Sequence, residues 1–159
     1  MARSVLLTYI TPVPSPLYNR DILRLAAAIP HLGRLPNAQS SVERTSPVCG
    51  SRVTVELILD AEGRVAEIAQ EVRACALGQA SAALMGAHAV GRTPEELLKA
   101  RASLASYLTG DADEPGSWPG LDVLAPARPY KARHPSILLP FDAAADAARQ
   151  AMAPEAAGR

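Results

Sequence analysis

The two cysteines of the 159-residue chain, Cys49 and Cys75, flank a predicted β-hairpin. Alternating apolar and polar residues predict a strand over 51–60, and a second strand follows a short turn at 64–74. In an antiparallel pair, positions equidistant from the turn face each other. For a turn centred on Glu62, the position that faces Cys49 is Cys75. We therefore expect the two thiols side by side at the open end of the hairpin, with Cβ atoms about 4.5–5.5 Å apart.

Paired thiolates are ligands for soft metals, zinc and iron–sulfur clusters. Cys75 lies where a predicted helix begins, and the partial positive charge of a helix N-terminus lowers the pKa of a thiol. Cys49 precedes Gly50, where the missing side chain leaves room for a ligand to approach the backbone. The alternative interpretation is that the two cysteines are small buried apolar side chains or form a disulfide.

A complete metal site needs about four ligands, so two cysteines do not suffice. The other soft donors are His31, His88 and His134. His88 falls within an Ala-rich helix and His31 lies beside a helix-ending proline. His134 lies in an Arg- and Pro-rich stretch before the last predicted helix, and it is the best candidate for a third ligand.

The elements around the hairpin predict an α+β fold, in which a small three-stranded antiparallel sheet packs against several helices. The third strand comes from the segment 42–48, ahead of the hairpin. A first helix is expected between Pro16 and Pro30, because Tyr18, Ile22, Leu25 and Ile29 recur at spacings of four and three. The later helices are expected over 76–90, over 93–110 with a capping box at Thr93 and Glu96, and over 136–152 with an interruption near Pro140.

Length and composition favour one globular domain, predicted over 17–152 between tails at 1–16 and 153–159. Sixteen basic and sixteen acidic residues give a net charge of zero, which argues against binding nucleic acid or an anionic membrane through bulk electrostatics. No apolar stretch reaches the ~18 residues of a membrane span. The segment 1–16 only faintly imitates a signal peptide, so we expect a cytoplasmic protein.

The chain from Leu17 to about Ala148 resembles the NifU-like, or U-type, iron–sulfur cluster assembly scaffolds. The resemblance rests on motifs in a shared order along the chain. These are Leu17-Tyr18 with Ile22-Leu23, the loop from Pro30 to Gly33, Pro47-Val48-Cys49-Gly50-Ser51, Ala74-Cys75-Ala76-Leu77 with Ala80-Ser81-Ala82, the turn Gly91-Arg92-Thr93, and the stretch from Tyr130 to Asp142.

The resemblance implies a scaffold that is not an enzyme, with the U-type fold. A cysteine desulfurase would deliver sulfur to it, and a finished iron–sulfur cluster would pass to acceptor apoproteins. It further implies Cys49 and Cys75 as ligands of a cluster, iron or zinc, with Cys75 as the sulfur acceptor. The chain departs from the family pattern at Ser51, where the family has Asp, and at Ser136, where the family has a third cysteine. His134 is two residues earlier and is the proposed substitute.

Two other function classes remain open. The first is a metal-free partner-binding module on the same fold, with Trp118 of the loop 111–120 as its anchor. A tryptophan in such a loop more commonly pins the loop to the core, and we favour that structural role. The second class is a hydrolase that uses Ser81, His88 and Asp142, but no Gly-x-Ser-x-Gly elbow supports it.

Overall fold

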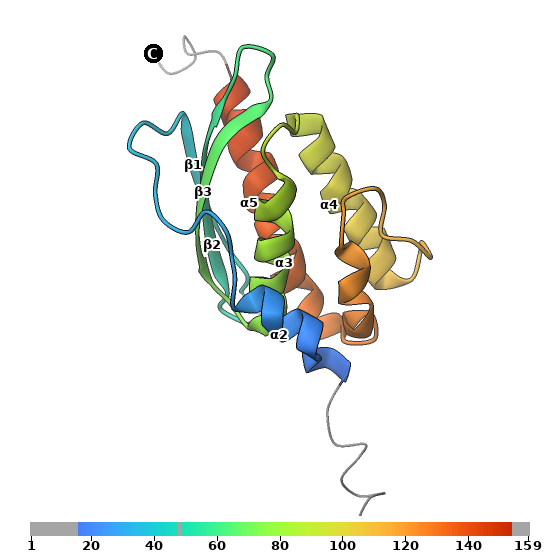
Figure 1. Cartoon of the computed structure of the whole chain (residues 1–159). Helices are drawn as coiled ribbons and strands as arrows, with labels where there is room; N and C mark the ends of the chain where they lie inside the picture. The colour runs from blue at the N-terminus through green and yellow to red at the C-terminus, as the bar shows by residue number, and fades with distance from the viewer. Residues whose placement is uncertain (1–15, 48, 154–159) are drawn as a thin grey trace, which may run out of the picture.

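The computed structural model describes residues 16–47 and 49–153, and it shows helices packed on one face of a small sheet (Figure 1). The sheet has three antiparallel strands in the order β1, β2, β3, with bounds Ser40–Thr45, Arg52–Leu59 and Val65–Arg73. The helices are α2 (Arg20–Ala26), α3 (Ala76–His88), α4 (Pro94–Thr109) and α5 (His134–Met152), with short 3-10 turns at Pro16–Tyr18, Leu121–Ala127 and Lys131–Arg133. The predicted α+β class with a three-stranded antiparallel sheet is therefore confirmed.

Helices α3 and α5 lie against the sheet, and α4 packs on the far side of α5 (Figure 1). Side chains of β2 that point towards these helices, Val53, Val55 and Leu57, are fully buried. Because side chains alternate along a strand, Ser51 just before β2 points in the same direction, towards α5. The N-terminal end of β2, the central strand, therefore lies close to the start of α5.

The hairpin of β2 and β3 is antiparallel, as predicted, but its register differs by one residue from the expected one. Arg52 pairs with Arg73, whereas a turn centred on Glu62 would have placed Val72 opposite Arg52. The cause is an irregularity in the ladder between Ile58 and Leu59, which adds one residue to one side of the hairpin. A one-residue shift at the turn still leaves the residues beyond the open end close together.

The first helix is shorter than its apolar pattern predicted. Asn19 caps α2 by accepting a hydrogen bond from the backbone N–H of Ile22, so the helix begins at Arg20 and the preceding 3-10 turn is separate. Tyr18 was expected on the buried helix face, but it is 37% exposed, and that expectation is wrong. The capping box of α4 is confirmed, since Thr93 and Glu96 bond each other's backbone N–H groups.

Helix α5 begins at His134, two residues before the predicted start, and it continues through Pro140. Proline lacks the N–H that would bond to the carbonyl four residues earlier, which here is that of Ser136. The helix accommodates this loss in its second turn, where Pro140 is buried against the rest of the molecule. The expected interruption at Pro140 is therefore wrong.

The loop that joins α2 to β1 covers the outer face of the sheet, opposite α3 and α5. It pairs with the edge of β3, where the backbone N–H of Gly33 donates to the carbonyl of Gln70 at 2.9 Å. It then crosses β2, where Glu56 accepts hydrogen bonds from the N–H of Leu35 at 2.9 Å and from Arg34 at 2.8 Å. The sequence predicted one buried face for this strand, yet Glu56 on the other face is also buried because of this loop.

The predicted tails lie mostly outside the described residues, at 1–15 and 154–159. The interpretation of the N-terminal stretch as a tail without a signal peptide falls on these residues. Among the described helices, none combines the length and the apolar character that crossing a bilayer requires.

Candidate functional site

Cys49 lies in the tight turn that joins β1 to β2. The turn is closed by the N–H of Ser46, which donates to the carbonyl of Ser51, and by the N–H of Gly50, which donates to the carbonyl of Ser46, both at 2.8 Å. Gly50 has a φ of +73°, a left-handed conformation that suits glycine. The turn holds Cys49 on the exposed side of the molecule.

Cys75 occupies the N-cap position of α3, as the sequence predicted, with an extended backbone at φ −65° and ψ 171°. It lies at the point where β3 has ended and the helix begins, at the same end of the sheet as the turn that carries Cys49. Its side chain is half-buried, and both cysteines are free thiols. The disulfide interpretation therefore does not describe this structure.

Two serine hydroxyls join the two thiols. The Sγ atom of Cys49 is 3.1 Å from the Oγ atom of Ser51, which is 2.9 Å from the Oγ atom of Ser136. The Oγ atom of Ser136 is in turn 3.5 Å from the Sγ atom of Cys75. We call Ser51 and Ser136 the hydroxyl bridge. The structure thus brings Cys49 and Cys75 to one site, as expected, and Ser51 and Ser136 connect them.

Both hydroxyls of the bridge are shielded from solvent, with Ser51 4% and Ser136 1% exposed. The close approach of Ser136 depends on Gly78 in the first turn of α3. A Cβ atom at Gly78 would lie 2.6 Å from the Oγ atom of Ser136 and 2.7 Å from the Cβ atom of Ala74. A larger residue at position 78 would therefore require Ser136 and Ala74 to shift.

Hydrogen bonds lower the pKa of the Cys49 thiol to about 7. The largest cause is the hydroxyl of Ser46, whose Oγ atom is 3.4 Å from the sulfur, followed by the hydroxyl of Ser51. Hydroxyl groups that donate to a thiolate stabilise the charged form. Because the side chain is also exposed, Cys49 is a nucleophile that reagents can reach at neutral pH. Sequence reasoning did not single out Ser46, although a serine three residues before a cysteine in a tight turn is a readable signal.

His134 is buried at the start of α5, and its ring faces backbone carbonyls. Its Nε2 atom is 3.0 Å from the carbonyl oxygen of Ala127 and 3.1 Å from that of Arg128. Because carbonyls only accept, Nε2 carries the proton and Nδ1 is the nitrogen left for another partner. In the part of the chain that the structure describes, no three His, Cys, Asp or Glu side chains lie close enough to hold a metal ion. The structure therefore does not group His134 with the two cysteines.

The donor set at the site consists of two thiols and two hydroxyls. Thiolates bind soft metals well, whereas a serine hydroxyl keeps its proton at neutral pH and is a weak ligand for iron or zinc. The two thiols thus account for half of a four-ligand set.

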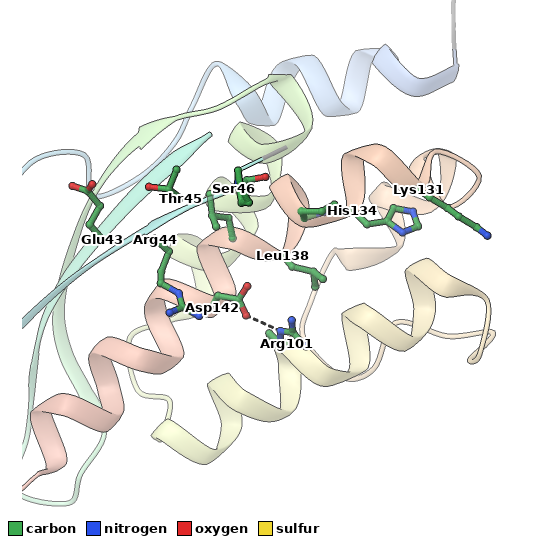
Figure 2. A pocket seen from close by; sticks show the side chains of 12 residues that line it. Glu43, Arg44, Thr45, Ser46, Arg101, Lys131, His134, Leu138 and Asp142 are labelled. Carbon is green, nitrogen blue, oxygen red and sulfur yellow. Dashed lines mark hydrogen bonds and ion pairs between the residues drawn. The ribbon is translucent and has the colours of Figure 1, made fainter. Parts of the chain in front are cut away.

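A cavity of about 600 Å³ opens beside the turn that carries Cys49 (Figure 2). Ser46 belongs to both features, because it lines the cavity and contacts the sulfur of Cys49. His134 and Lys131 lie at one end of the cavity, and an ion pair between Arg101 and Asp142, at 2.6 Å, crosses its wall. The sequence did not predict this cavity, since its walls come from β1, α4 and α5, which are far apart in the chain.

Trp118 is 4% exposed and pins its loop to the core, as we favoured. Its indole N–H donates to the carbonyl of Leu84 at 2.9 Å. Its ring packs edge to face against that of Phe141, with 5.3 Å between the ring centroids. It is therefore not available as a partner anchor. The hydrolase interpretation is not supported either, because Ser81 donates to the carbonyl of Ile137 and Asp142 pairs with Arg101.

Comparison with known proteins relates the chain to a described family. The family model described as "NifU-like N terminal domain" matches residues 17–126. A crystal structure of a nitrogen-fixing NifU-like protein, N-terminal part, from Brucella abortus is 39% identical, with a TM-score of 0.81; the match covers 86% of this chain and 95% of that one. A putative iron–sulfur cluster assembly scaffold protein for the SUF system from Fervidobacterium islandicum AW-1 is 22% identical, with a TM-score of 0.76 and coverage of 83% and 96%, and it shows the shared fold. No curated protein matches the chain.

Proposed function

The chain belongs to the NifU-like N-terminal domain family, and from this premise we propose that it is a scaffold, or a sulfur-accepting relative of scaffolds, in iron–sulfur cluster assembly. The observation that carries the proposal is the joint placement of Cys49 and Cys75 at one site, linked through the hydroxyl bridge. Such a protein accepts and hands on cargo rather than converting a substrate, so we propose no enzymatic activity.

Cys49 and Cys75 are the proposed sulfur-accepting thiols. Cys49 is exposed and its pKa is lowered to about 7, so it is the first thiol that a sulfur donor meets. Cys75 lies deeper, at the start of α3, and remains a proposed acceptor inside the site. The proposed donor is the persulfide of a cysteine desulfurase, and the sulfur arrives without a change in the overall number of S–S bonds.

The cargo of the proposed scaffold is an iron–sulfur cluster or its iron, with zinc as the alternative metal. Cys49 and Cys75 would supply two ligands, and Nδ1 of His134 would supply a third if the start of α5 moved, since the structure does not group these residues. With two strong ligands, we expect less than one metal equivalent per chain. Acceptor apoproteins in the cytoplasm would take the cargo onward.

The metal-free partner-binding alternative has no observation in its favour. Its proposed anchor, Trp118, is buried against Leu84 and Phe141. The cavity reaches Ser46, which contacts the sulfur of Cys49, so a partner that entered it would lie beside the turn that carries this thiol.

Anaerobic reconstitution tests the proposed function. Protein, iron, cysteine and a cysteine desulfurase are incubated, and the visible absorbance of the cluster is measured per chain, together with iron content. We expect substoichiometric absorbance in the wild type and none in the Cys49→Ala, Cys75→Ala double variant. The variant that carries Ser51→Asp and Ser136→Cys restores the family residues and should raise the yield.

Two outcomes would contradict a scaffold. The first is equal iron content in the wild type and in the double cysteine variant. The second is a restored variant that folds but gains no absorbance, because the missing ligands would then not be what limits assembly. A Ser81→Ala variant is the matched control, since Ser81 is a buried serine between α3 and α5 without a thiol contact.

A further inference from the structure

The contacts between Cys49 and Cys75 form one continuous path of hydrogen-bonding atoms. The path runs from the sulfur of Cys75 through the hydroxyls of Ser136 and Ser51 to the sulfur of Cys49, with steps of 3.5, 2.9 and 3.1 Å. Each hydroxyl both donates one hydrogen bond and accepts another. Because either atom of each pair can be the donor, the path can carry a proton in either direction, including the one in which Cys75 donates first and Cys49 accepts last.

The two ends of this path differ in access. Cys49 is exposed on the turn between β1 and β2, whereas Cys75 is half-buried and both bridging hydroxyls are shielded. A sulfur donor from outside therefore meets Cys49 first. A sulfur atom stored on Cys75 would be better protected from solvent and from oxidants.

We propose that Cys49 and Cys75 form an intramolecular sulfur relay, in which a sulfane sulfur passes from Cys49 to Cys75 while a proton passes the other way through Ser136 and Ser51. This relay rests on the proposed sulfur-accepting function of the chain. It gives the two serines, which stand where cluster ligands would be expected, a chemical task of their own.

The step balances without an external oxidant or reductant. The sulfur of Cys75 attacks the outer sulfur of the Cys49 persulfide, so a new S–S bond forms on Cys75 and the old S–S bond on Cys49 breaks. Cys49 leaves as a thiolate, and the thiol proton of Cys75 reaches it as each hydroxyl of the bridge donates one proton and receives another. One persulfide is consumed and one is formed.

The transfer requires the outer sulfur of a Cys49 persulfide to reach the sulfur of Cys75. An S–S bond is about 2 Å long, so a persulfide on Cys49 extends its reactive sulfur by that distance beyond Sγ. Gly50 follows Cys49 in the turn, and a Cβ atom built on it would meet no heavy atom within 4 Å. The position of the missing Gly50 side chain is therefore open, and no neighbouring element among the described residues packs against the turn at this point. Gly78 keeps the hydroxyl of Ser136 close to Cys75 on the other side.

The test follows the position of the sulfane sulfur over time. Glutathione persulfide is the probe, added in limiting amount under anaerobic conditions, and an alkylating maleimide quenches the reaction at successive times. Trypsin cleaves after Arg44, Arg52, Arg73 and Arg92, so Cys49 and Cys75 fall in separate peptides, 45–52 and 74–92. Mass spectrometry then gives the persulfide fraction on each cysteine.

In the wild type we expect sulfur on Cys49 first and on Cys75 later. In Cys49→Ala, the loading of Cys75 should fall by about tenfold or more, because the exposed entry point is gone. In Ser51→Ala and in Ser136→Ala, Cys49 should still load, while the appearance of sulfur on Cys75 should slow by about tenfold or more, as is usual when a positioned proton donor is removed.

Three comparisons separate the relay from a merely structural role of the serines. Ser51→Thr keeps a hydroxyl and should restore transfer, and Ser81→Ala should behave like the wild type. The far-ultraviolet circular dichroism spectrum reports that each variant is folded. Loading of Cys75 at the wild-type rate in Cys49→Ala, or in both Ser51→Ala and Ser136→Ala, would overturn the relay and leave the sulfur-accepting function intact. A wild type in which neither cysteine gains sulfur would overturn the proposed function as well.

Discussion

Glu56 of β2 and Cys49 of the turn before it both have a lowered pKa, but the two groups differ in their exposure to solvent. In each, hydrogen bonds to the charged form lower the pKa: the backbone N–H of Leu35 is the largest cause for Glu56, and the hydroxyl of Ser46 is the largest for Cys49. Glu56 is enclosed by the loop that crosses the outer face of the sheet, whereas Cys49 is exposed. The enclosed anion holds a loop in place, and the exposed one is available for reaction.

Removing the charge of Glu56 should have the largest effect on stability. Glu56→Gln loses the ionic bond to Arg34 and leaves the N–H of Leu35 with a weaker acceptor. We expect a loss of about 1–3 kcal/mol in the free energy of unfolding, measured by urea denaturation. Glu71→Gln is the control, because Glu71 pairs with the same Arg34 but is half-exposed, and it should cost less than about 0.5 kcal/mol. Equal losses of unfolding free energy in both variants would contradict the claim that the buried Glu56 stabilises the fold more than the half-exposed Glu71.

The same carboxylate predicts a pH dependence of stability. The pKa of Glu56 is lower in the folded chain than the ordinary value of about 4.3, so the folded state favours the charged form. Its stabilising contribution is complete above that ordinary value and is lost as the pH falls through the lower pKa of the folded state. Urea denaturation of the wild type at a series of pH values should show this loss, and Glu56→Gln should show a shallower one. Parallel profiles would contradict the assignment.

At Cys49 the corresponding prediction concerns rate rather than stability. With a pKa of about 7, against about 8.5 for an ordinary thiol, the thiolate fraction of Cys49 at pH 6.5 should be about 20-fold larger than that of a free cysteine. Because a more acidic thiolate is a weaker nucleophile, Cys49 should then react with iodoacetamide about fivefold faster than a free cysteine at this pH. Peptide mass spectrometry of the alkylated chain gives the rate as a function of pH. A midpoint near that of an ordinary thiol would contradict the lowered pKa of Cys49.

Ser46→Ala should have a smaller effect of the same kind. The hydroxyl of Ser46 is the largest cause of the lowered pKa, while Ser51 continues to donate. The midpoint of the alkylation profile should therefore rise part of the way to the ordinary value, and the rate at neutral pH should fall a few-fold. Thr45→Ala, in the neighbouring position of β1, is the control that should leave the midpoint in place.

The smallest effect is expected for Cys49→Ala on stability. An exposed side chain contributes little to the core, so the free energy of unfolding should change by less than about 0.5 kcal/mol. A loss as large as that of Glu56→Gln would mean that Cys49 is a structural residue, and the distinction between the two anions would fail.

The sequence was sufficient where local patterns control the structure. Short-range signals predicted the capping box at Thr93, the helix start at Cys75 and the hairpin. Because residues equidistant from a hairpin turn face each other, the two cysteines were correctly predicted at one end of the sheet, although the irregularity at Ile58 shifts the register by one residue. The role of Trp118 in the core also followed from its loop.

Contacts between distant segments were not readable in the same way. The loop that buries Glu56, the approach of Ser136 to Gly78 and the cavity beside Ser46 all join residues that are far apart in the chain. No periodicity encodes such contacts, because they depend on how the sheet and the helices pack. The sequence therefore singled out the two cysteines, Ser51 and Ser136, but not the hydrogen bonds that connect them.

The most direct test of the account is whether the site accepts sulfur from a protein donor. The chain is incubated without oxygen with a cysteine desulfurase and cysteine, and its intact mass is measured under non-reducing conditions. The account predicts that the wild type gains the mass of sulfur, that Cys49→Ala gains far less, and that the Cys49→Ala, Cys75→Ala double variant gains none. A wild type that gains no sulfur, or a double variant that gains as much as the wild type, would contradict it.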